Sequence, residues 1–234
     1  MAHEEYVISP VTVDDIPGMT EVYLSSFASD PFSAYTFPRD KITEEEMNRW
    51  LTKRFTRMLD RREMHTLKII DTSTPTNTQV AFFRYATPHE LTSSEKAARE
   101  SEKQERAEVI KRTGRDPTWP LGANVEICDG KFGGLDRMRE KFVDEKEMYV
   151  AHLLCVSPSH QRLGLGSRLL EHVLDQADRE NRKCYIEATS AGHPVYFKLG
   201  FRDVDVLKLD LKPWGGDFVA ISRLMIRDPP QPIV

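Results

Sequence analysis

The sequence predicts a mixed α/β sheet flanked by helices, in one domain. Strands and helices alternate through the C-terminal half of the chain, which favours this fold class. The length of 234 residues fits one large or decorated domain and suffices to bury a core without disulfides or metal ions. We therefore expect residues 1–234 to form a single domain. Residues 90–147 are expected to be a helical insertion between the third and fourth strands, and residues 227–234 a frayed tail.

The first third of the chain carries signals for two helices and three strands. Thr12 is placed to cap a helix whose apolar residues recur at helical spacing as far as Phe27. Thr43 and Glu46 form the capping-box pattern at the start of a second helix. Strands are expected at Glu5–Pro10, His65–Asp71 and Gln79–Thr87.

Two features in this third allow more than one interpretation. The segment Ser29–Pro38 is rich in aromatic residues and holds two prolines, so we expect a loop held by buried rings, or part of a substrate-pocket wall. In the second helix acids come first and bases come late, an order that complements the helix dipole. We therefore interpret the late bases as stabilising the helix rather than as an anion site. These bases are Lys53, Arg54, Arg57, Arg61 and Arg62.

The insertion differs in composition from the rest of the chain. From Glu90 to Arg115 acids and bases alternate with few apolar residues, which predicts a solvent-exposed helix with ion pairs one turn apart. Glycines and prolines make Asp116–Gly134 irregular, and a short amphipathic helix is expected around Leu135–Phe142. The insertion has too few apolar residues to bury a core of its own, so we expect it to shape a substrate pocket.

The C-terminal half supplies the alternating elements. Glu147–Val156 is a strongly apolar strand, and Gly164–Asn181 has apolar residues spaced by four, which indicates a helix. The remaining elements are expected to be strands at Lys183–Ala188, Arg202–Leu211 and Asp217–Ile226, with a short helix at Pro194–Leu199.

Composition excludes several classes of function. A net charge of −4 gives no reason to expect nucleic acid as a partner, and no stretch approaches the roughly 18 apolar residues of a membrane span. The first ten residues show neither the basic nor the apolar region of a secretory signal, so a cytoplasmic location is expected. Cys128, Cys155 and Cys184 lie far apart, which argues against a disulfide framework or a metal site.

The most informative segment is the junction Leu153–Ser167 between the apolar strand and the helix that follows. The strand turns at Pro158, and Gly164 and Gly166 lead into the helix. The first N–H groups of a helix have no backbone partner and lie at its positive end, so a phosphate binds there readily. Walker-loop and dinucleotide motifs both fail on spacing. A plain strand–loop–helix connection remains the alternative.

Two motifs around this junction resemble a known family. Gln161, Gly164 and Gly166 form Q-x-x-G-x-G after an L-x-V-x-P strand, which resembles the acyl-CoA-binding motif of the GNAT superfamily of N-acyltransferases. Downstream, Tyr196–Phe201 is similar to that superfamily's Y-x-x-x-G-F motif. The resemblance covers about residues 150–201, and its details are similar to small-molecule acetyltransferases of the puromycin N-acetyltransferase type.

The resemblance implies a GNAT fold, in which a twisted mixed sheet splays after the strand ending at Val156. Acetyl-CoA would be the co-substrate, without a metal, and its pyrophosphate would meet the amides from Arg162 to Ser167. The Val156 amide would polarise the thioester carbonyl. Thr189 stands where many members have Asn. The implied coenzyme-binding residues are Leu154, Cys155, Val156, Gln161, Arg162, Leu163, Gly164, Leu165, Gly166, Ser167 and Thr189.

Acyl transfer to an amine needs two proton transfers, because the amine must lose a proton and the departing thiolate must gain one. Tyr196 matches the tyrosine often proposed as the acid in this superfamily, although it also suits simple packing. His152 is the preferred base, since alternation puts it on the face of Leu154 and Val156 and histidine titrates near neutrality. A buried histidine bonded to a backbone carbonyl is the alternative. The second choices for the base are Glu147 and Glu126.

These observations favour an N-acetyltransferase that acetylates a small primary amine by direct attack in a ternary complex. No cysteine nucleophile is needed, because alternation points Cys155 away from the His152 face. Two alternatives stay open: a protein lysine or N-terminal acetyltransferase, and a non-catalytic acyl-CoA-binding module. In each case neither nucleic acid nor membrane is expected as a partner.

Overall fold

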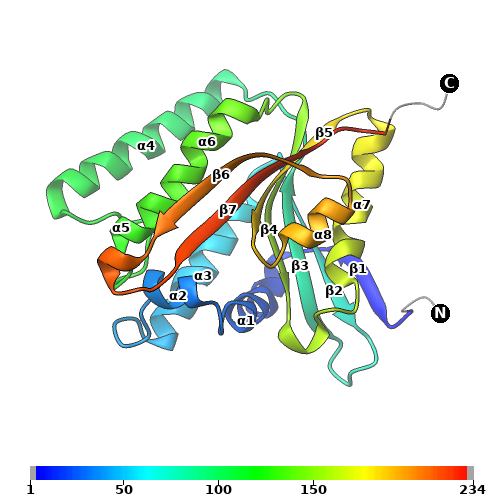
Figure 1. The fold of residues 1–234 in the computed structure, drawn as a ribbon, viewed down its shortest axis with the longest axis horizontal. Coiled ribbons are helices and arrows are strands. Elements are labelled where there is room, and N and C mark those ends of the chain that lie inside the picture. The colour runs from blue at the N-terminus through cyan, green and yellow to red at the C-terminus, as the bar shows by residue number, and fades with distance from the viewer. Residues whose placement is uncertain (1–3, 231–234) are drawn as a thin grey trace.

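A computed structural model describes residues 4–230 and shows a seven-stranded sheet at the centre of the molecule (Figure 1). The strand order is β1-β2-β3-β4-β5-β7-β6, and every neighbouring pair is antiparallel except the parallel pair β4–β5. The predicted mixed α/β sheet is therefore confirmed. The strands are β1 (Tyr6–Pro10), β2 (Met64–Asp71), β3 (Thr78–Ala86), β4 (Met148–Val156), β5 (Lys183–Thr189), β6 (Arg202–Asp210) and β7 (Val219–Arg227).

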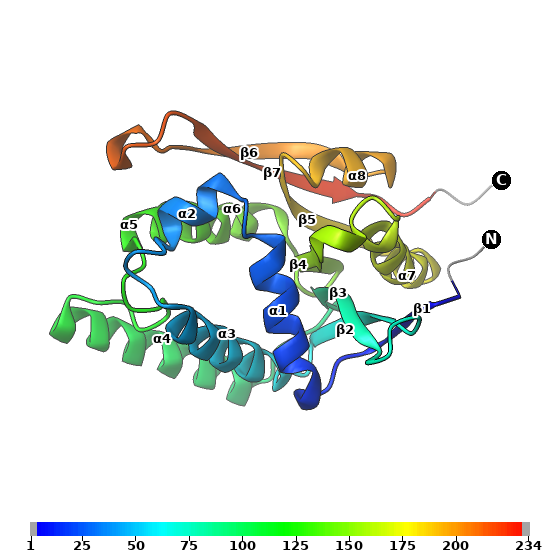
Figure 2. The ribbon, with the colours of Figure 1, turned by 90° about the horizontal axis from the view of Figure 1, so that it is seen from below.

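Helices cover the two faces of this sheet, as Figure 2 shows. Alternate residues of β3 point to opposite faces: Phe83 joins the apolar cluster of α7, and Phe82 joins that of α1 and α3. We call the face covered by α1, α3 and α6 the inner face. The helices are α1 (Ile16–Ser26), α2 (Pro31–Thr36), α3 (Glu44–Leu59), α4 (Ser93–Thr113), α5 (Val125–Cys128), α6 (Gly134–Phe142), α7 (Leu165–Arg179) and α8 (His193–Lys198).

Local signals account for where most helices begin. At α3 the Thr43 hydroxyl accepts a hydrogen bond from Glu46 N at 3.2 Å, and the Glu46 carboxylate accepts one from Thr43 N at 3.3 Å. This confirms the predicted capping box. In α7, Leu165, Leu169, Val173 and Ala177 are all buried against the sheet, as their spacing by four indicates.

Two segments predicted as irregular are helical instead. Within Ser29–Pro38, Asp30 caps α2 by accepting from Phe32 N and Ser33 N at 3.4 and 3.2 Å, and Pro31 takes the first helical position. The glycine-rich stretch after Asn124 forms α5, then a π-helical turn at Asp129–Gly133, then α6 without a break. Burial of Ile127 and Cys128 outweighs the low helix propensity of the glycines.

The insertion lies against the rest of the molecule rather than around a core of its own. Every residue of α4 remains at least partly exposed, as its charge pattern predicts. The segment after α4 contributes Trp119 and Cys128 to an aromatic cluster with Phe37 and Trp50. A single domain that includes residues 90–147 therefore stays our prediction.

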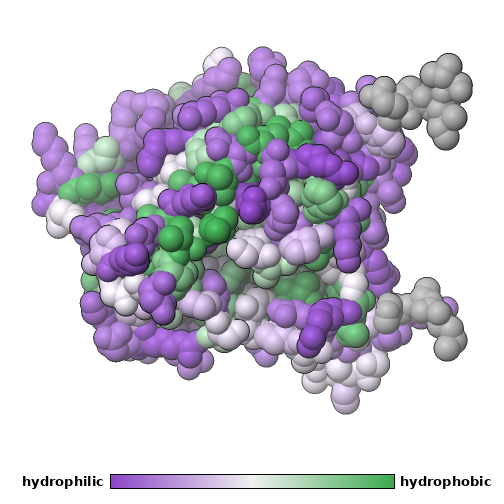
Figure 3. Space-filling model, viewed as in Figure 1, coloured by the Kyte–Doolittle hydropathy of each residue, from purple (hydrophilic) through white to green (hydrophobic). Residues whose placement is uncertain are grey.

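The outer strands carry part of their apolar surface to solvent. Figure 3 shows hydrophobic residues gathered along β6 and β7, and Val204 and Val219 on these strands are exposed. β7 extends to Arg227, so only residues 228–230 of the expected tail are described as irregular, and residues 231–234 lie outside the described part. Among the helices of residues 4–230, none combines the length and the apolarity needed to cross a bilayer.

Candidate active site

The sheet opens between β4 and β5. The two strands pair only from Met148 to Ala151 on β4 and from Lys183 to Ile186 on β5, although both continue further. Beyond these residues β4 keeps its pairing with β3, and β5 keeps its pairing with β7. The predicted splay is therefore present, and it leaves one edge of the last part of β4 without a strand partner.

The backbone of Leu154 and Val156 points into this opening. Ser157 N donates to Val80 O at 2.8 Å, so in the antiparallel β3–β4 pair Cys155 bonds to β3, while Leu154 and Val156 turn their amides the other way. The Val156 carbonyl is already used, because it accepts from Ser26 Oγ at 3.0 Å and Gln161 Nε2 at 3.1 Å. The amide hydrogens are thus the groups that the splay offers to a ligand.

The glycine loop follows directly. Gly164 has a left-handed backbone (φ 78°) and precedes the first residue of α7, and a Cβ built on it would meet no atom within 4 Å. The first hydrogen bond of the helix runs from Arg168 N to Gly164 O at 3.0 Å, so the amides of Leu165, Gly166 and Ser167 precede it. Arg162 also has positive φ (63°). The loop from Gln161 to Gly164 is exposed, and its open space suits a diphosphate.

Two residues predicted to lie beside the coenzyme come after Ile186, the last residue of β5 that pairs with β4. Thr189 ends β5 and its hydroxyl accepts from Gly192 N at 3.2 Å. Tyr196 is 9% exposed on α8, and its ring lies against Gly192, where an added Cβ would come within 3.1 Å of the phenol oxygen. Burial raises the Tyr196 pKa to about 12, so the phenol stays protonated at neutral pH and can only donate its proton.

His152 lies at an irregularity of β4. Arg84 pairs with Leu153 and Tyr85 with Ala151, so His152 is the extra residue of a β-bulge. Leu153 and Cys155 both pack toward α1 and α3, whereas Leu154 and Val156 pack toward α7. Alternation therefore holds from Leu153 to Val156, with Cys155 opposite Leu154 and Val156, and the bulge interrupts it at His152.

The pKa of His152 differs from the expectation that it titrates near neutrality. Burial, aided by the positive charges of Arg139, Arg84 and Arg61, lowers its pKa to about 3. Its side chain is nevertheless exposed to solvent, although the strands on either side of β4 are mostly buried. The ring therefore meets solvent and is neutral at physiological pH.

The other candidate residues are bound to other side chains or buried. Glu147 forms an ion pair with Arg182 before β4 begins, and Glu126 accepts from Trp214 Nε1 at 3.1 Å. Cys155 is 2% exposed, and burial raises the pKa of its thiol. It is a packing residue in this structure rather than a thiolate.

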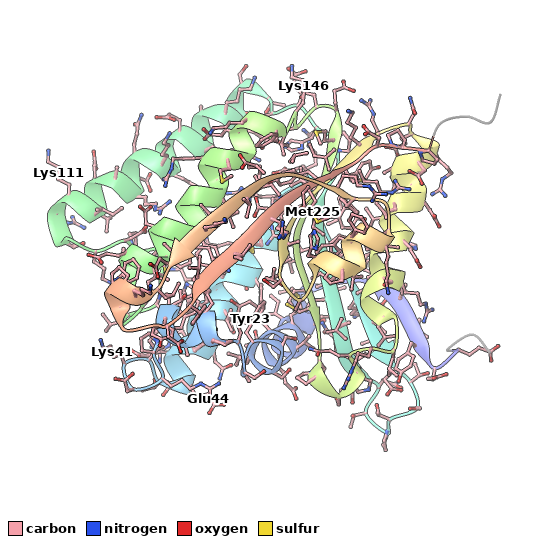
Figure 4. All side chains as sticks on the ribbon, in the orientation of Figure 1. Tyr23, Lys41, Glu44, Lys111, Lys146 and Met225 are labelled. Atoms are coloured by element: carbon pink, nitrogen blue, oxygen red, sulfur yellow. The ribbon has the colours of Figure 1, made fainter. Side chains whose placement is uncertain are left out.

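Several side chains of the inner face were not recognised in the sequence. Tyr23, labelled in Figure 4, lies where α1 meets α3 and 6.0 Å from the Phe55 ring. Glu187 on β5 accepts from Arg139 Nε and Nη2 at 3.0 and 2.7 Å and from the Tyr185 hydroxyl at 3.0 Å. No local motif marks such residues, because they come together only when distant segments fold.

Comparison with known proteins shows which family part of this chain resembles. Residues 129–209 match the family model of the acetyltransferase (GNAT) domain. The matched residues run from the start of the π-helical turn to β6, which is about a third of the chain. A stretch of 81 residues is also 32% identical to an uncharacterized N-acetyltransferase of Schizosaccharomyces pombe. That match covers 35% of this chain and 34% of the yeast protein, so it spans about a third of the length of its curated relative.

Solved structures show that the GNAT fold extends beyond the matched residues. A protein of Corynebacterium glutamicum described as histone acetyltransferase HPA2 and related acetyltransferase superposes with a TM-score of 0.57 at 18% identity, covering 98% of this chain and 99% of its own. An agmatine N-acetyltransferase gives 0.58 at 15% identity, covering 96% and 100%. The ribosomal-protein-S18-alanine N-acetyltransferase of Escherichia coli gives 0.52 at 14%, covering 97% and 96%.

The GNAT fold of this chain has no cluster suited to a metal ion within residues 4–230, where three or more histidine, cysteine or acidic side chains never come together in the required way. Of the two proton-transfer candidates, Tyr196 belongs to the apolar cluster of α7, and His152 is influenced by the charges of Arg139, Arg84 and Arg61.

Proposed function

We propose that the protein is an acetyl-CoA-dependent N-acetyltransferase that acetylates a primary amine of a small molecule by direct attack in a ternary complex. The observation that carries this proposal is the opening between β4 and β5, which leaves the amides of Leu154 and Val156 beside the free amides that begin α7. A strand edge and a helix N-terminus together suit a long polar ligand that ends in a diphosphate.

The chain has groups for each part of the coenzyme, which supplies the acetyl thioester when bound. In the proposal the amides of Gly164, Leu165, Gly166 and Ser167 hold the diphosphate, helped by Gln161, Arg162 and Leu163. The strand residues Leu154 and Val156, with Thr189, hold the pantetheine arm, and Cys155 between them keeps the strand bonded to β3. Gly166 supports this fit, because a Cβ there would lie 3.6 Å from the Leu154 side chain and 3.5 Å from that of Val156.

In the proposal, different groups stabilise the carbonyl oxygen, protonate the leaving sulfur and orient the amine. The Val156 N–H is fixed before the reaction, so it can stabilise negative charge on the carbonyl oxygen without reorganisation. Tyr196 keeps its proton at neutral pH and donates it to the leaving sulfur. His152 is neutral and too weak a base to store a proton, so it orients the amine or a water molecule that carries the proton away.

A small acceptor is favoured over a peptide by one feature of the structure. α2 packs on the β6–β7 connection through the cluster of Phe32, Ile127 and Leu211, and the Tyr35 hydroxyl donates to Gly215 O at 3.3 Å. This contact joins the helices of the inner face to the outer strands, so one end of the site is covered. Solved structures of this fold include both an agmatine and a ribosomal-protein acetyltransferase, so the fold itself does not determine the kind of acceptor.

A cytoplasmic location is part of the proposal. All three cysteines are free thiols in the structure, which suits a reducing compartment. Neither nucleic acid nor a membrane is proposed as a partner.

The experiment incubates the protein with labelled acetyl-CoA and either a panel of small amines or a peptide library. We expect label transfer to a small amine, and a fall in kcat of about a hundredfold in Tyr196→Phe with unchanged coenzyme affinity. Tyr149→Phe is the matched control, because its buried hydroxyl donates to Glu180 at 2.7 Å away from the splay. Transfer only to peptides would support the protein acetyltransferase, and tight coenzyme binding without any transfer would support the non-catalytic module.

A further inference from the structure

Three basic side chains come from separate segments: Arg54 on α3, Arg84 on β3 and Lys131 in the π-helical turn. Two adjacent rings connect Lys131 to Arg54, because Lys131 lies 5.9 Å from the centre of Phe132, which is 5.1 Å from Trp119, and Arg54 lies 5.9 Å from Trp119. Within residues 4–230 none of the three forms an ion pair with a carboxylate. Arg84 is buried, and Arg54 and Lys131 are partly exposed. A buried cation usually has a carboxylate partner, because an unpaired buried charge is costly.

Arg54 is separated from the rest of its basic cluster. Arg57, Arg61 and Arg62 reach outward to Glu102 and Glu95 of α4, which fits the helix-stabilising interpretation. The Arg54 guanidinium instead lies 5.4 Å from the ring centre of Trp50 and 5.9 Å from that of Trp119. Stacking on aromatic rings holds the guanidinium in place but leaves its N–H donors for another partner.

Arg84 lies deeper and is more poorly satisfied. It is 4% exposed, and its Nε and Nη1 atoms are buried without a hydrogen-bond partner in the described chain. Its only hydrogen bond there is from Nη2 to Met58 O, at 3.5 Å. Since Arg84 is paired in register with Leu153, next to the bulge at His152, its charge acts on the open part of β4.

Lys131 completes the set from the insertion. Its ammonium lies 3.9 Å from the ring centre of Phe32 and carries no ion pair within residues 4–230. The two acids whose charges act on it are already engaged: Asp30 caps α2, and Glu187 accepts two hydrogen bonds from Arg139. Arg139 in turn also binds Asp136 at 3.0 Å. Arg54, Arg84 and Lys131 thus add positive charges that no carboxylate of residues 4–230 neutralises in an ion pair.

We propose that the acceptor is a small primary amine that also carries an anionic group, a carboxylate or a phosphate, and that Arg54 and Lys131 bind this group. The inference rests on the proposed function and adds the substrate class. Arg84 is a positioning residue that keeps the wall behind His152 positive. An anionic group satisfies the free donors of Arg54 through two parallel hydrogen bonds, whereas a cationic amine without such a group would be repelled.

The experiment compares acceptors that differ only in charge. One pair is an ω-amino acid and its primary amide, and the other is an aminoalkyl phosphate and the matching amino alcohol; a diamine serves as the cationic acceptor. We expect kcat/KM to be at least about tenfold higher for the anionic member of one pair. The pair that shows this difference identifies the anionic group of the acceptor as a carboxylate or a phosphate. Arg54→Gln should remove the preference by raising KM for the anionic amine, with kcat nearly unchanged.

Controls separate a lost charge from a lost fold. Lys53→Gln removes an exposed charge one residue away on the same helix and should leave the preference intact. Arg54→Lys keeps the charge and should retain part of the preference, and Lys131→Gln tests the second cation if Arg54→Gln fails to fold. As an activity-independent measurement, a carboxylate or phosphate of the same chain length without the amine should raise the melting temperature of the wild type but not of Lys131→Gln.

Two kinds of failure are distinguishable. Acetylation of uncharged or cationic amines with equal or better kcat/KM than their anionic partners would overturn the substrate class and leave the proposed function standing. Absence of transfer to every amine, although the protein binds coenzyme A, would overturn the proposed function itself.

Discussion

At the scale of single residues, the backbone of Gly164 is the sharpest test of the coenzyme loop. Its φ of 78° is unfavourable for any residue with a Cβ, and it stands where α7 offers its first amides. We expect Gly164→Ala to lower the free energy of unfolding by about 1 kcal/mol and to weaken coenzyme A binding at least about tenfold, because the loop shifts. Titration calorimetry and chemical denaturation measure the two effects.

Gly215→Ala is the matched control for this change. Gly215 has nearly the same φ (83°) and the same open surroundings, but it lies in the turn between β6 and β7. It should show the same loss of stability with unchanged coenzyme affinity. Equal affinity in both variants would contradict the placement of the diphosphate at α7.

The charge of His152 gives a second residue-scale prediction. Its folded pKa of about 3 lies below the unfolded value near 6.5, so the ring is neutral in the folded enzyme throughout the physiological range. We therefore expect kcat/KM to rise with pH until the acceptor amine itself is deprotonated, without a separate step near 6.5. A step near 6.5 that disappears in His152→Gln would show that the histidine stores the proton, contrary to this expectation.

His152 also shows what a residue pattern can and cannot predict. Its place in an apolar strand singled it out correctly as unusual, because a polar side chain there needs a reason. Its pKa and its place at the β-bulge depend on pairing with β3 and on arginines from β3, from the turn after α3 and from α6, which no local pattern encodes. Arg54 illustrates the same limit. Arg57, its neighbour in sequence, forms an ion pair with α4, and only the contact of Arg54 with Trp50 distinguishes it.

At the scale of elements, α4 is held mainly by charge. Its residues are at least partly exposed, and so are the ion pairs Arg57–Glu102, Arg61–Glu102 and Arg62–Glu95 that join it to the end of α3 and the turn after it. Salt screens exposed pairs, so we expect amide hydrogen exchange in α4 to speed up several-fold between low salt and 1 M salt. α7 is the internal control, because buried leucines hold it to the sheet and its exchange should not change. Equal responses of α4 and α7 would contradict an electrostatic attachment.

The elements that the sequence predicted well are those with strong local signals. The capping box at Thr43 and the apolar spacing of α7 located these helices to within a few residues. α2 and the unbroken run from α5 to α6 were missed, because a short cap at Asp30 and the burial of Ile127 compete with proline and glycine signals that usually mark loops. Burial of this kind is set by distant segments, so it is absent from any short window of sequence.

At the scale of the whole molecule, the sheet consists of two parts with a narrow connection. β1–β4 and β5–β7 are joined within the sheet only where Met148–Ala151 lies beside Lys183–Ile186. α7 reinforces this connection, since its buried face contacts β2, β3, β4 and β5. The proposed coenzyme would touch β4, the start of α7 and the end of β5, and so would connect the two parts where their strands separate.

Binding at such a place must stabilise the fold, because the unfolded chain has no splay to bind. At a coenzyme A concentration about a hundred times its Kd, the gain is about 2.7 kcal/mol, which corresponds to a rise of about 5–10 °C in melting temperature for a chain of this size. Hydrogen exchange should slow most in Leu154–Val156 and at Thr189, which lie on opposite sides of the opening. Gly164→Ala should require more coenzyme for the same rise, and Gly215→Ala should not. If hydrogen exchange slowed only in α7 and in neither strand, the coenzyme would bind at the helix terminus and not between the two parts of the sheet.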